Sequence, residues 1–208
     1  MSVITRPSIS TRRRIPAARP YALLPESARS LTAKQFFTTL PPESRYTLIE
    51  GMCLEDPSPI PFHQQVTLNL SYSLHAHLKA HRIGGRFFGV PVDFVVDQHN
   101  VYQPDLSYFS PKRAKGVLRD KITTVPEFVI EVLSPSTAKY DLGVKRRHYA
   151  ANGVEEMWIV DPRKEAVAIY RFAEDGEKPV AVFSRPSDLA EAQVIPNWRI
   201  SLKEIFAD

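Results

Sequence analysis

Glu131 is the residue whose position most strongly indicates chemistry. It stands in the run Phe-Val-Ile-Glu-Val-Leu, residues 128–133, which is otherwise apolar on both faces, as a central buried strand is. A carboxylate in such a strand is costly unless it is paired or bound to a metal ion. Asp105 stands at the head of a second apolar run, Leu106–Phe109. Two acids that project from adjacent strands can share one divalent cation.

The cation that suits such a pair is Mg²⁺ or Mn²⁺. Mg²⁺ prefers hard oxygen ligands in an octahedron and usually keeps several waters. A bound cation of this kind lowers the pKa of its water and stabilises charge on a phosphoryl group. The residues therefore indicate metal-assisted phosphoryl chemistry. The structural alternative is a buried carboxylate paired with a nearby lysine or arginine, and the pattern alone leaves both readings open.

A predicted helix at about residues 141–151 would supply a positive charge. Spacings of four, seven and eight residues place four side chains on or near one face: Asp141, Lys145, His148 and Tyr149. Lys145 could orient an attacking water and offset the charge of a pentavalent phosphate. Arg146 and Arg147 point elsewhere and could hold backbone phosphates. An ordinary solvated basic helix is the alternative.

Hydrophobic periodicity and turn residues predict the elements that must position these side chains. Helices are predicted at 31–37 with Thr32 as N-cap, at 60–81, at 141–151 and at 202–206. Strands are predicted at 46–54 as a pair turning at Gly51, and at 86–88, 92–96, 106–109, 128–133, 157–160, 167–172 and 180–183. Helices and strands interleave before strands dominate the last third, which indicates a mixed α/β or α+β fold.

Length and composition indicate one soluble domain. The chain has 208 residues, of which 43% are hydrophobic. No apolar run approaches the roughly 18–20 residues that span a bilayer, and the N-terminus lacks the apolar core of a secretory signal. A cytoplasmic protein without membrane association is therefore expected. The single cysteine, Cys53, excludes an internal disulfide, fits a reducing compartment and is expected to be buried.

The net charge of +4 is unevenly placed. The first twenty residues hold five arginines and no acid, and the remainder has 22 basic against 23 acidic side chains. The body is not basic, so overall charge does not identify a partner. Residues 1–30 are expected to be a disordered basic tail and residues 31–208 the folded domain. A phosphate-contacting arm and an organelle transit peptide are alternatives for the tail.

Two other groups of residues carry weaker signals. His77 and His81 are four apart on a helix, a spacing able to bind zinc, but no glutamate accompanies them and a solvated face is favoured. The basic residues between 112 and 121 could follow a phosphate backbone, although such a run is more often a solvated loop.

Several motifs resemble those of a known family. They are Gln-Pro-Asp at 103–105, Pro-Glu-Phe-Val-Ile-Glu-Val-Leu-Ser-Pro-Ser-Thr at 126–137, then Asp141, Lys145, Tyr149, Gly153-Val154, Glu156 and Trp-Ile-Val-Asp at 158–161. Upstream, Tyr-Thr-Leu-Ile-Glu-Gly at 46–51 looks like the family's opening element, and His63 occupies the place of the histidine that starts its long helix. Over about residues 31–206 the chain resembles the Uma-two family of the restriction-endonuclease-like PD-(D/E)XK superfamily.

The resemblance implies a central mixed sheet flanked by helices, with the site at one sheet edge. It implies metal ligands at Asp105 and Glu131 and at the carbonyl of Val132. It also implies that the motif lysine has migrated. The standard position, two residues after Glu131, holds Leu133, and Lys145 on the following helix can supply the same cation. A structural cap or a hydrogen-bonding role is the equal alternative for His63.

The resemblance also shows two departures. The family usually has acids where Thr47 and Met52 stand, so Glu50 is expected to support the metal shell as a further catalytic residue. The leading hypothesis is a Mg²⁺- or Mn²⁺-dependent endonuclease that hydrolyses DNA. One alternative is a catalytically weakened nuclease fold that binds nucleic acid or a partner. Another is a nuclease of a mobile element or of DNA repair that needs a partner for specificity. A homodimer remains open.

Overall fold

The central layer of the protein is a mixed sheet. The computed structural model describes residues 30–40, 45–56, 58–115, 117 and 122–207, so the expected tail, apart from Ser30, lies outside the described residues. Within them, six strands form this sheet in the order β10-β9-β8-β7-β6-β3. They are β3 (Arg86–Phe88), β6 (Leu106–Phe109), β7 (Phe128–Val132), β8 (Glu156–Asp161), β9 (Ala166–Arg171) and β10 (Ala181–Phe183). β7 and β8 are parallel and the other neighbours antiparallel, which confirms the predicted mixed class.

A smaller antiparallel sheet lies beside the first, with its strands in the order β2-β1-β5-β4. Its described strands are β1 (Tyr46–Ile49), β2 (Met52–Glu55), β4 (Phe94–Asp97) and β5 (Asn100–Tyr102). The predicted hairpin at 46–54 is confirmed, and it turns on two residues in the left-handed region, Glu50 at φ 50° and Gly51 at φ 79°. Positive φ at both central residues matches the right-handed twist of the flanking strands.

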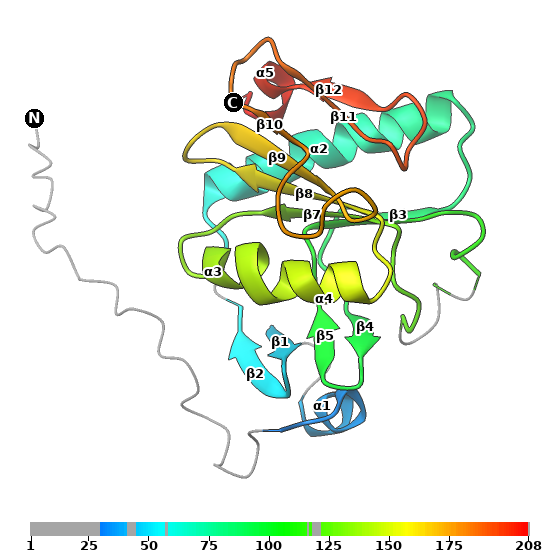
Figure 1. The fold of residues 1–208 in the computed structure, drawn as a ribbon, viewed down its shortest axis with the longest axis vertical. Coiled ribbons are helices and arrows are strands. Elements are labelled where there is room, and N and C mark those ends of the chain that lie inside the picture. The colour runs from blue at the N-terminus through cyan, green and yellow to red at the C-terminus, as the bar shows by residue number, and fades with distance from the viewer. Residues whose placement is uncertain (1–29, 41–44, 57, 116, 118–121, 208) are drawn as a thin grey trace, which may run out of the picture.

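The helices lie on opposite sides of the central sheet (Figure 1). α2 (Pro61–Ala80) covers one face, and one continuous helical segment covers the other. That segment comprises α3 (Ala138–Tyr140), a π turn (Asp141–Lys145) and α4 (Arg146–Ala151). α1 (Ala33–Thr39) begins at Thr32, which forms the expected cap and a capping box with Gln35. No helix in the described residues is long and apolar enough to cross a membrane.

Alternation along β7 decides which side chains meet which helix. Phe128, Ile130 and Val132 pack with the α2 stripe Val66, Leu70 and Leu74 in one buried core. Val129 belongs to the opposite core, together with Tyr149 of α4. Because strand residues two apart share a face, Glu131 points to the α4 side with Val129. Its carboxylate is therefore placed between the central sheet and the helical segment.

The strand predictions missed three short strands. β5 has only three residues and follows a tight turn from β4, with a register shift between Val95 and Asp97. β11 (Leu189–Glu191) and β12 (Arg199–Ser201) form a separate pair that leads into α5 (Leu202–Ile205). The helix expected at 141–151 also begins earlier, at Ala138.

Gly143 in the π turn and Gly153 just after α4 provide a test of the backbone there. A Cβ added to Gly143 or to Gly153 would meet nothing within 4 Å, but only Gly153 has a positive φ, +89°. Gly143→Ala should therefore stabilise the protein by about 0.5–1 kcal/mol, because alanine loses less backbone entropy in a helix. Gly153→Ala should destabilise it, since alanine is strained there. Thermal unfolding of both variants measures the difference, and equal shifts would contradict this account.

Candidate active site

Glu131 is buried beneath the helical segment and is held by two donors. Its side chain is 4% exposed. Its Oε1 accepts a 2.7 Å hydrogen bond from the Tyr149 hydroxyl and a 3.2 Å bond from Lys145 Nζ. Burial raises the pKa of the Glu131 carboxyl to about 8, against the opposing effect of Lys145. The site thus holds a carboxylate that is costly to ionise unless further positive charge arrives.

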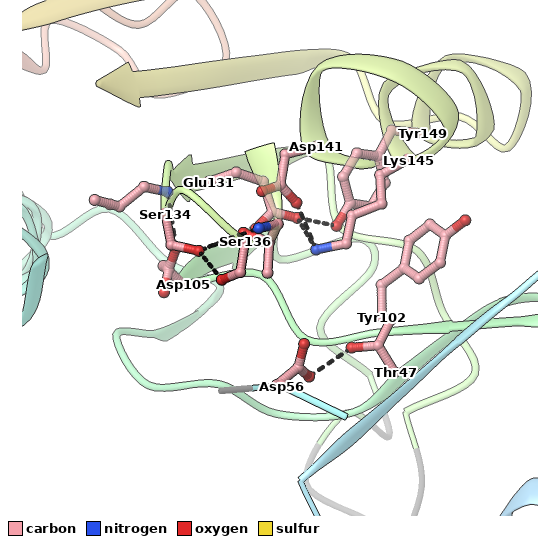
Figure 2. Close-up of polar contacts among 12 residues, drawn as sticks. Thr47, Asp56, Tyr102, Asp105, Glu131, Ser134, Ser136, Asp141, Lys145 and Tyr149 are labelled. Atoms are coloured by element: carbon pink, nitrogen blue, oxygen red, sulfur yellow. Dashed lines mark hydrogen bonds and ion pairs between the residues drawn. The ribbon is translucent and has the colours of Figure 1, made fainter. Parts of the chain in front are cut away.

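Lys145 reaches Glu131 from the π turn. Its Nζ lies 2.8 Å from Oδ1 of Asp141, four residues earlier in the chain. The two groups form an ion pair, but their angles do not meet those of a hydrogen bond. One turn of a π-helix holds more residues than the 3.6 of an α-helix, so side chains four residues apart point in more nearly the same direction. Single π turns also occur often at functional sites. Burial alone would lower the pKa of Lys145, but Asp141 and Glu131 raise it well above its usual value. The lysine is therefore a charged ammonium. Figure 2 shows it beside the carboxylates of Asp141 and Glu131.

Asp105 lies at the same end of the sheet as Glu131. Leu106 pairs with Ile130, so the residue before Leu106 leaves β6 beside the end of β7. Asp105 Oδ2 accepts a 2.7 Å hydrogen bond from the Val132 amide, and the side chain is 16% exposed. His63 Nε2 lies 2.8 Å from the Val132 carbonyl oxygen and 3.5 Å from Asp105 Oδ2. Burial opposes a charge on His63, but Asp105 and this carbonyl raise its pKa.

These residues line one cleft of about 210 Å³. Its walls come from the segment after β2, the loop after β7 and the turn between β8 and β9, and the lining includes Asp105, Glu131, Val132, Asp141 and Lys145. The predicted ligand residues and the predicted lysine are thus brought together. The structure also shows that Lys145 is paired with both Asp141 and Glu131. The two hypotheses for Glu131, a metal ligand or the partner of a lysine, therefore concern the same group of residues.

Asp56 is a cleft acid that the sequence analysis missed. It follows β2, lines the cleft, and accepts a 2.7 Å hydrogen bond from the Thr47 hydroxyl (Figure 2). Burial raises the pKa of its carboxyl, while Thr47 and Lys145 oppose the rise. Its only signal in the sequence is an acid between a strand and a Pro-rich segment, which does not reveal the direction of the side chain.

Glu50 does not join this cleft. It lies at the tip of the β1–β2 hairpin with a 58% exposed side chain, and its Oε1 is 3.8 Å from His148 Nε2. The cleft lining does not include it. Glu50 is thus exposed at the hairpin tip, whereas Asp56 at the hairpin base lines the cleft. The hairpin thus contributes an acid to the cleft, but from a different position than expected.

The expectation that Arg146 holds backbone phosphates is wrong. Its side chain is buried, bonds to the Gly176 carbonyl and to Glu177 Oε2 at 2.8 Å, and lies over the Tyr170 ring. It therefore fixes the helical segment to a loop. Arg163, in the turn between β8 and β9, lines the cleft instead.

The donor chemistry of the cleft fits a hard divalent cation. Four carboxylates line it, those of Asp56, Asp105, Glu131 and Asp141. The cationic side chains in the lining are those of Lys145, Arg45 and Arg163. No group of three His, Cys, Asp or Glu side chains among the described residues is arranged to hold a metal ion. Two carboxylates and one carbonyl would leave the remaining positions to water, which is how Mg²⁺ is usually bound.

A mixed sheet with an acid pair and a lysine at one end is the arrangement that the resemblance implied for restriction-endonuclease-like proteins. The model of the Uma2 family, described as "Putative restriction endonuclease", matches residues 33–203. The chain belongs to this family. The fold is similar to a crystal structure described as a "putative nuclease belonging to DUF820" from Anabaena variabilis, with a TM-score of 0.73 and 22% identity. That match covers 85% of this chain and 98% of the other. No curated protein matches the chain.

The raised pKa of Glu131 predicts a pH-dependent stability. In the metal-free protein the folded state keeps a proton on Glu131 up to about pH 8, whereas the unfolded chain releases it near 4.5. Stability contributed by this group is therefore lost as pH rises through that window. Glu131→Gln removes the loss, so its advantage in Tm over the parent should grow between pH 5 and pH 8. About 1 kcal/mol corresponds to ~2–4 °C for this length.

Thermal unfolding in EDTA at several pH values measures this difference. A Glu131→Gln variant that is much less stable than the parent at pH 8 would contradict the expectation. It would mean that the carboxylate serves mainly as the counter-ion of Lys145, whose ammonium the variant leaves with Asp141 alone.

Proposed function

We propose that the chain is a divalent-metal-dependent endonuclease that hydrolyses DNA phosphodiester bonds. One observation carries the proposal: Asp105, Glu131 and Lys145 line a single cleft although they come from two strands and a helix. The family description and the fold of the Anabaena variabilis protein support a nuclease-like activity. The metal, the substrate and the roles of the residues belong to the proposal.

Asp105, Glu131 and the Val132 carbonyl would hold Mg²⁺ or Mn²⁺. Asp105 Oδ2 and Glu131 Oε1 already accept hydrogen bonds, while no described residue makes a hydrogen bond to Asp105 Oδ1 or Glu131 Oε2. Each carboxylate thus has one oxygen fixed by the fold and one left for a ligand. Such a cation would make its bound water more acidic and would offset charge on the phosphoryl group.

Lys145 would act on the attacking water and on the transition state. Its ammonium is fixed between Asp141 and Glu131, and a fixed charge needs no reorganisation as negative charge grows on phosphorus. A protonated lysine has no lone pair, so it cannot itself be a metal ligand. Asp141 would position the ammonium without touching the substrate.

Arg163 would contact a substrate phosphate. Lys145 is already paired with two carboxylates, whereas the Arg163 guanidinium makes no hydrogen bond or ion pair with another described residue. An arginine fork can bind a phosphate through two parallel hydrogen bonds. Its place on a turn at the cleft rim suits a DNA backbone that lies across the cleft.

A second candidate is a nuclease fold that binds nucleic acid without cutting it. Two observations favour it: Glu50 lies outside the cleft, and no three acidic or ligating side chains are arranged around one metal position among the described residues. The cleft and Arg163 would then serve binding alone. The assays below distinguish the two candidates.

Replacing a proposed metal ligand and replacing the lysine should have different effects on metal binding and cleavage. Asp105→Asn keeps an oxygen that can accept from the Val132 amide but removes the charge, so metal binding and cleavage should be lost together. Lys145→Met fills the same space without a charge, so it should keep Mn²⁺ binding and lose cleavage by about 10²–10³-fold or more. Calorimetric Mn²⁺ titration and plasmid nicking with Mg²⁺, Mn²⁺ or EDTA measure both properties.

Three outcomes would count against the proposal. A parent protein that nicks plasmid equally in EDTA has no metal-dependent step. A parent that binds DNA and never cuts it is the second candidate. If Lys145→Met cuts at the parent rate, the role of Lys145 is structural, as the partner of two carboxylates in buried ion pairs.

Arg163 and its neighbour Lys164 form a matched pair for the DNA contact. Lys164 is 79% exposed, pairs with Asp161 at 3.4 Å and does not line the cleft. Arg163→Ala should weaken binding to a duplex oligonucleotide and lower the slope of log affinity against log salt by about 1. Lys164→Ala should change both much less. Fluorescence anisotropy in EDTA measures the slopes, and equal effects of the two variants would exclude a specific role for Arg163.

A further inference from the structure

His63 occupies the interior of the cleft at the start of α2. It is the third residue of that helix, and its side chain is 9% exposed. Its Nε2 lies 2.8 Å from the Val132 carbonyl oxygen and 3.5 Å from Asp105 Oδ2. Both of these oxygens belong to groups that the proposed function assigns to the metal. One ring nitrogen thus faces two of the three assigned ligands.

The partner of Nε2 fixes the protonation of this ring nitrogen. A carbonyl oxygen can only accept a hydrogen bond, so Nε2 must carry the hydrogen and donate it. A nitrogen that carries a hydrogen has no lone pair for a cation. As it lies here, His63 is therefore a donor to the ligand set and not a ligand.

The other ring nitrogen is not fixed. His63 Nδ1 is buried and has no hydrogen-bond partner among the described residues. Histidines that bind metals in proteins almost always have their second nitrogen bonded to a carboxylate, carbonyl or water, which sets the orientation of the ring. The His63 ring lacks that second bond, so it can leave the Val132 carbonyl by breaking one hydrogen bond only.

We propose that His63 is a positioning residue that holds Asp105 and the Val132 carbonyl in place while the cleft is empty and that competes with the divalent cation for them. This inference rests on the proposed metal site. In the metal-free protein the Nε2–H group places its partial positive charge beside the carbonyl oxygen of Val132 and the carboxylate of Asp105 and stabilises both. A cation bound to the Val132 carbonyl oxygen and to the free Oδ1 of Asp105 repels that hydrogen and takes over its role, so the two exclude each other.

Competition has a definite consequence for metal affinity. By linkage, whatever stabilises the metal-free state and is lost on binding weakens binding by the same factor. Removing the His63 donor should therefore destabilise the metal-free protein and tighten Mn²⁺ binding. A histidine that oriented or ligated the metal would have the opposite effect on affinity, since loss of such a residue typically costs about 10–100-fold.

The variants separate these roles. His63→Leu removes the donor at similar volume, and His63→Gln restores a donor that can reach a carbonyl. His77→Ala is the matched control, because His77 lies on the same helix and makes the same kind of contact, Nε2 to the Pro196 carbonyl at 2.9 Å, away from the cleft. Thermal unfolding in EDTA and in Mn²⁺, with calorimetric Mn²⁺ titration, gives stability and affinity without reference to cleavage.

We expect His63→Leu to lower Tm in EDTA, to show a larger Mn²⁺-induced rise in Tm than the parent, and to bind Mn²⁺ about three- to tenfold more tightly, the size of one hydrogen bond's net contribution. His63→Gln should return both values towards the parent, and His77→Ala should leave the Mn²⁺ affinity unchanged. If His63→Leu does not fold, the comparison of His63→Gln with the parent still tests the idea. The flexible glutamine side chain holds the Val132 carbonyl less firmly than the imidazole does, so the His63→Gln protein should bind Mn²⁺ more tightly than the parent.

Two results would overturn the proposal. Unchanged Mn²⁺ affinity, with Tm lowered equally in EDTA and Mn²⁺, would make His63 a packing residue. Weaker affinity would make it a ligand or an orienting residue. A parent that binds no Mn²⁺ would instead refute the metal site of the proposed function, and the competition with it. The failure of each proposal is thus recognised separately.

Discussion

The arrangement of the molecule depends on one buried carboxylate. Glu131 stands on a strand that is buried on both faces, where an unpaired charge would be prohibitively costly. The Tyr149 hydroxyl and the Lys145 ammonium reach it from the helical segment on that face. This contact fixes the rotation and the height of the segment over the sheet. Asp141 and Lys145, at the two ends of the π turn, are both buried and face inward.

The sequence predicted the parts of this arrangement that depend on local pattern. The double-sided apolar run around Glu131 identifies a central strand, and the spacing from Asp141 to Tyr149 identifies the inward face of a helix. The first follows from burial on both faces of a central strand, and the second follows from the 3.6-residue period of a helix. The meeting of Asp105 with the end of β7 depends on strand register, and the family resemblance carried that prediction, because register is set by contacts across the sheet.

The parts that failed depend on the direction of single side chains. Glu50 lies at the tip of the hairpin with a 58% exposed side chain, and only Asp56, at the hairpin base, lines the cleft. Arg146 is charged and neighbours exposed residues, yet it is buried against Tyr170 and bound to Glu177. For Arg146 a distant segment, which holds Gly176 and Glu177, decides the orientation, and no local pattern of residues encodes that segment.

The charge balance of the cleft connects stability with activity. Burial raises the pKa of Glu131 and of Asp56, while the ammonium of Lys145 is shared between two carboxylates. A cleft built only for stability would have matched its acids with cations or replaced them with apolar groups, which is often neutral or stabilising. Here four carboxyl groups face only three cations, those of Lys145, Arg45 and Arg163, and a histidine donor faces two of the proposed ligand groups. A site with this imbalance gains most from a cation that arrives from solution, so the same groups that weaken the empty protein would give the loaded protein its binding energy.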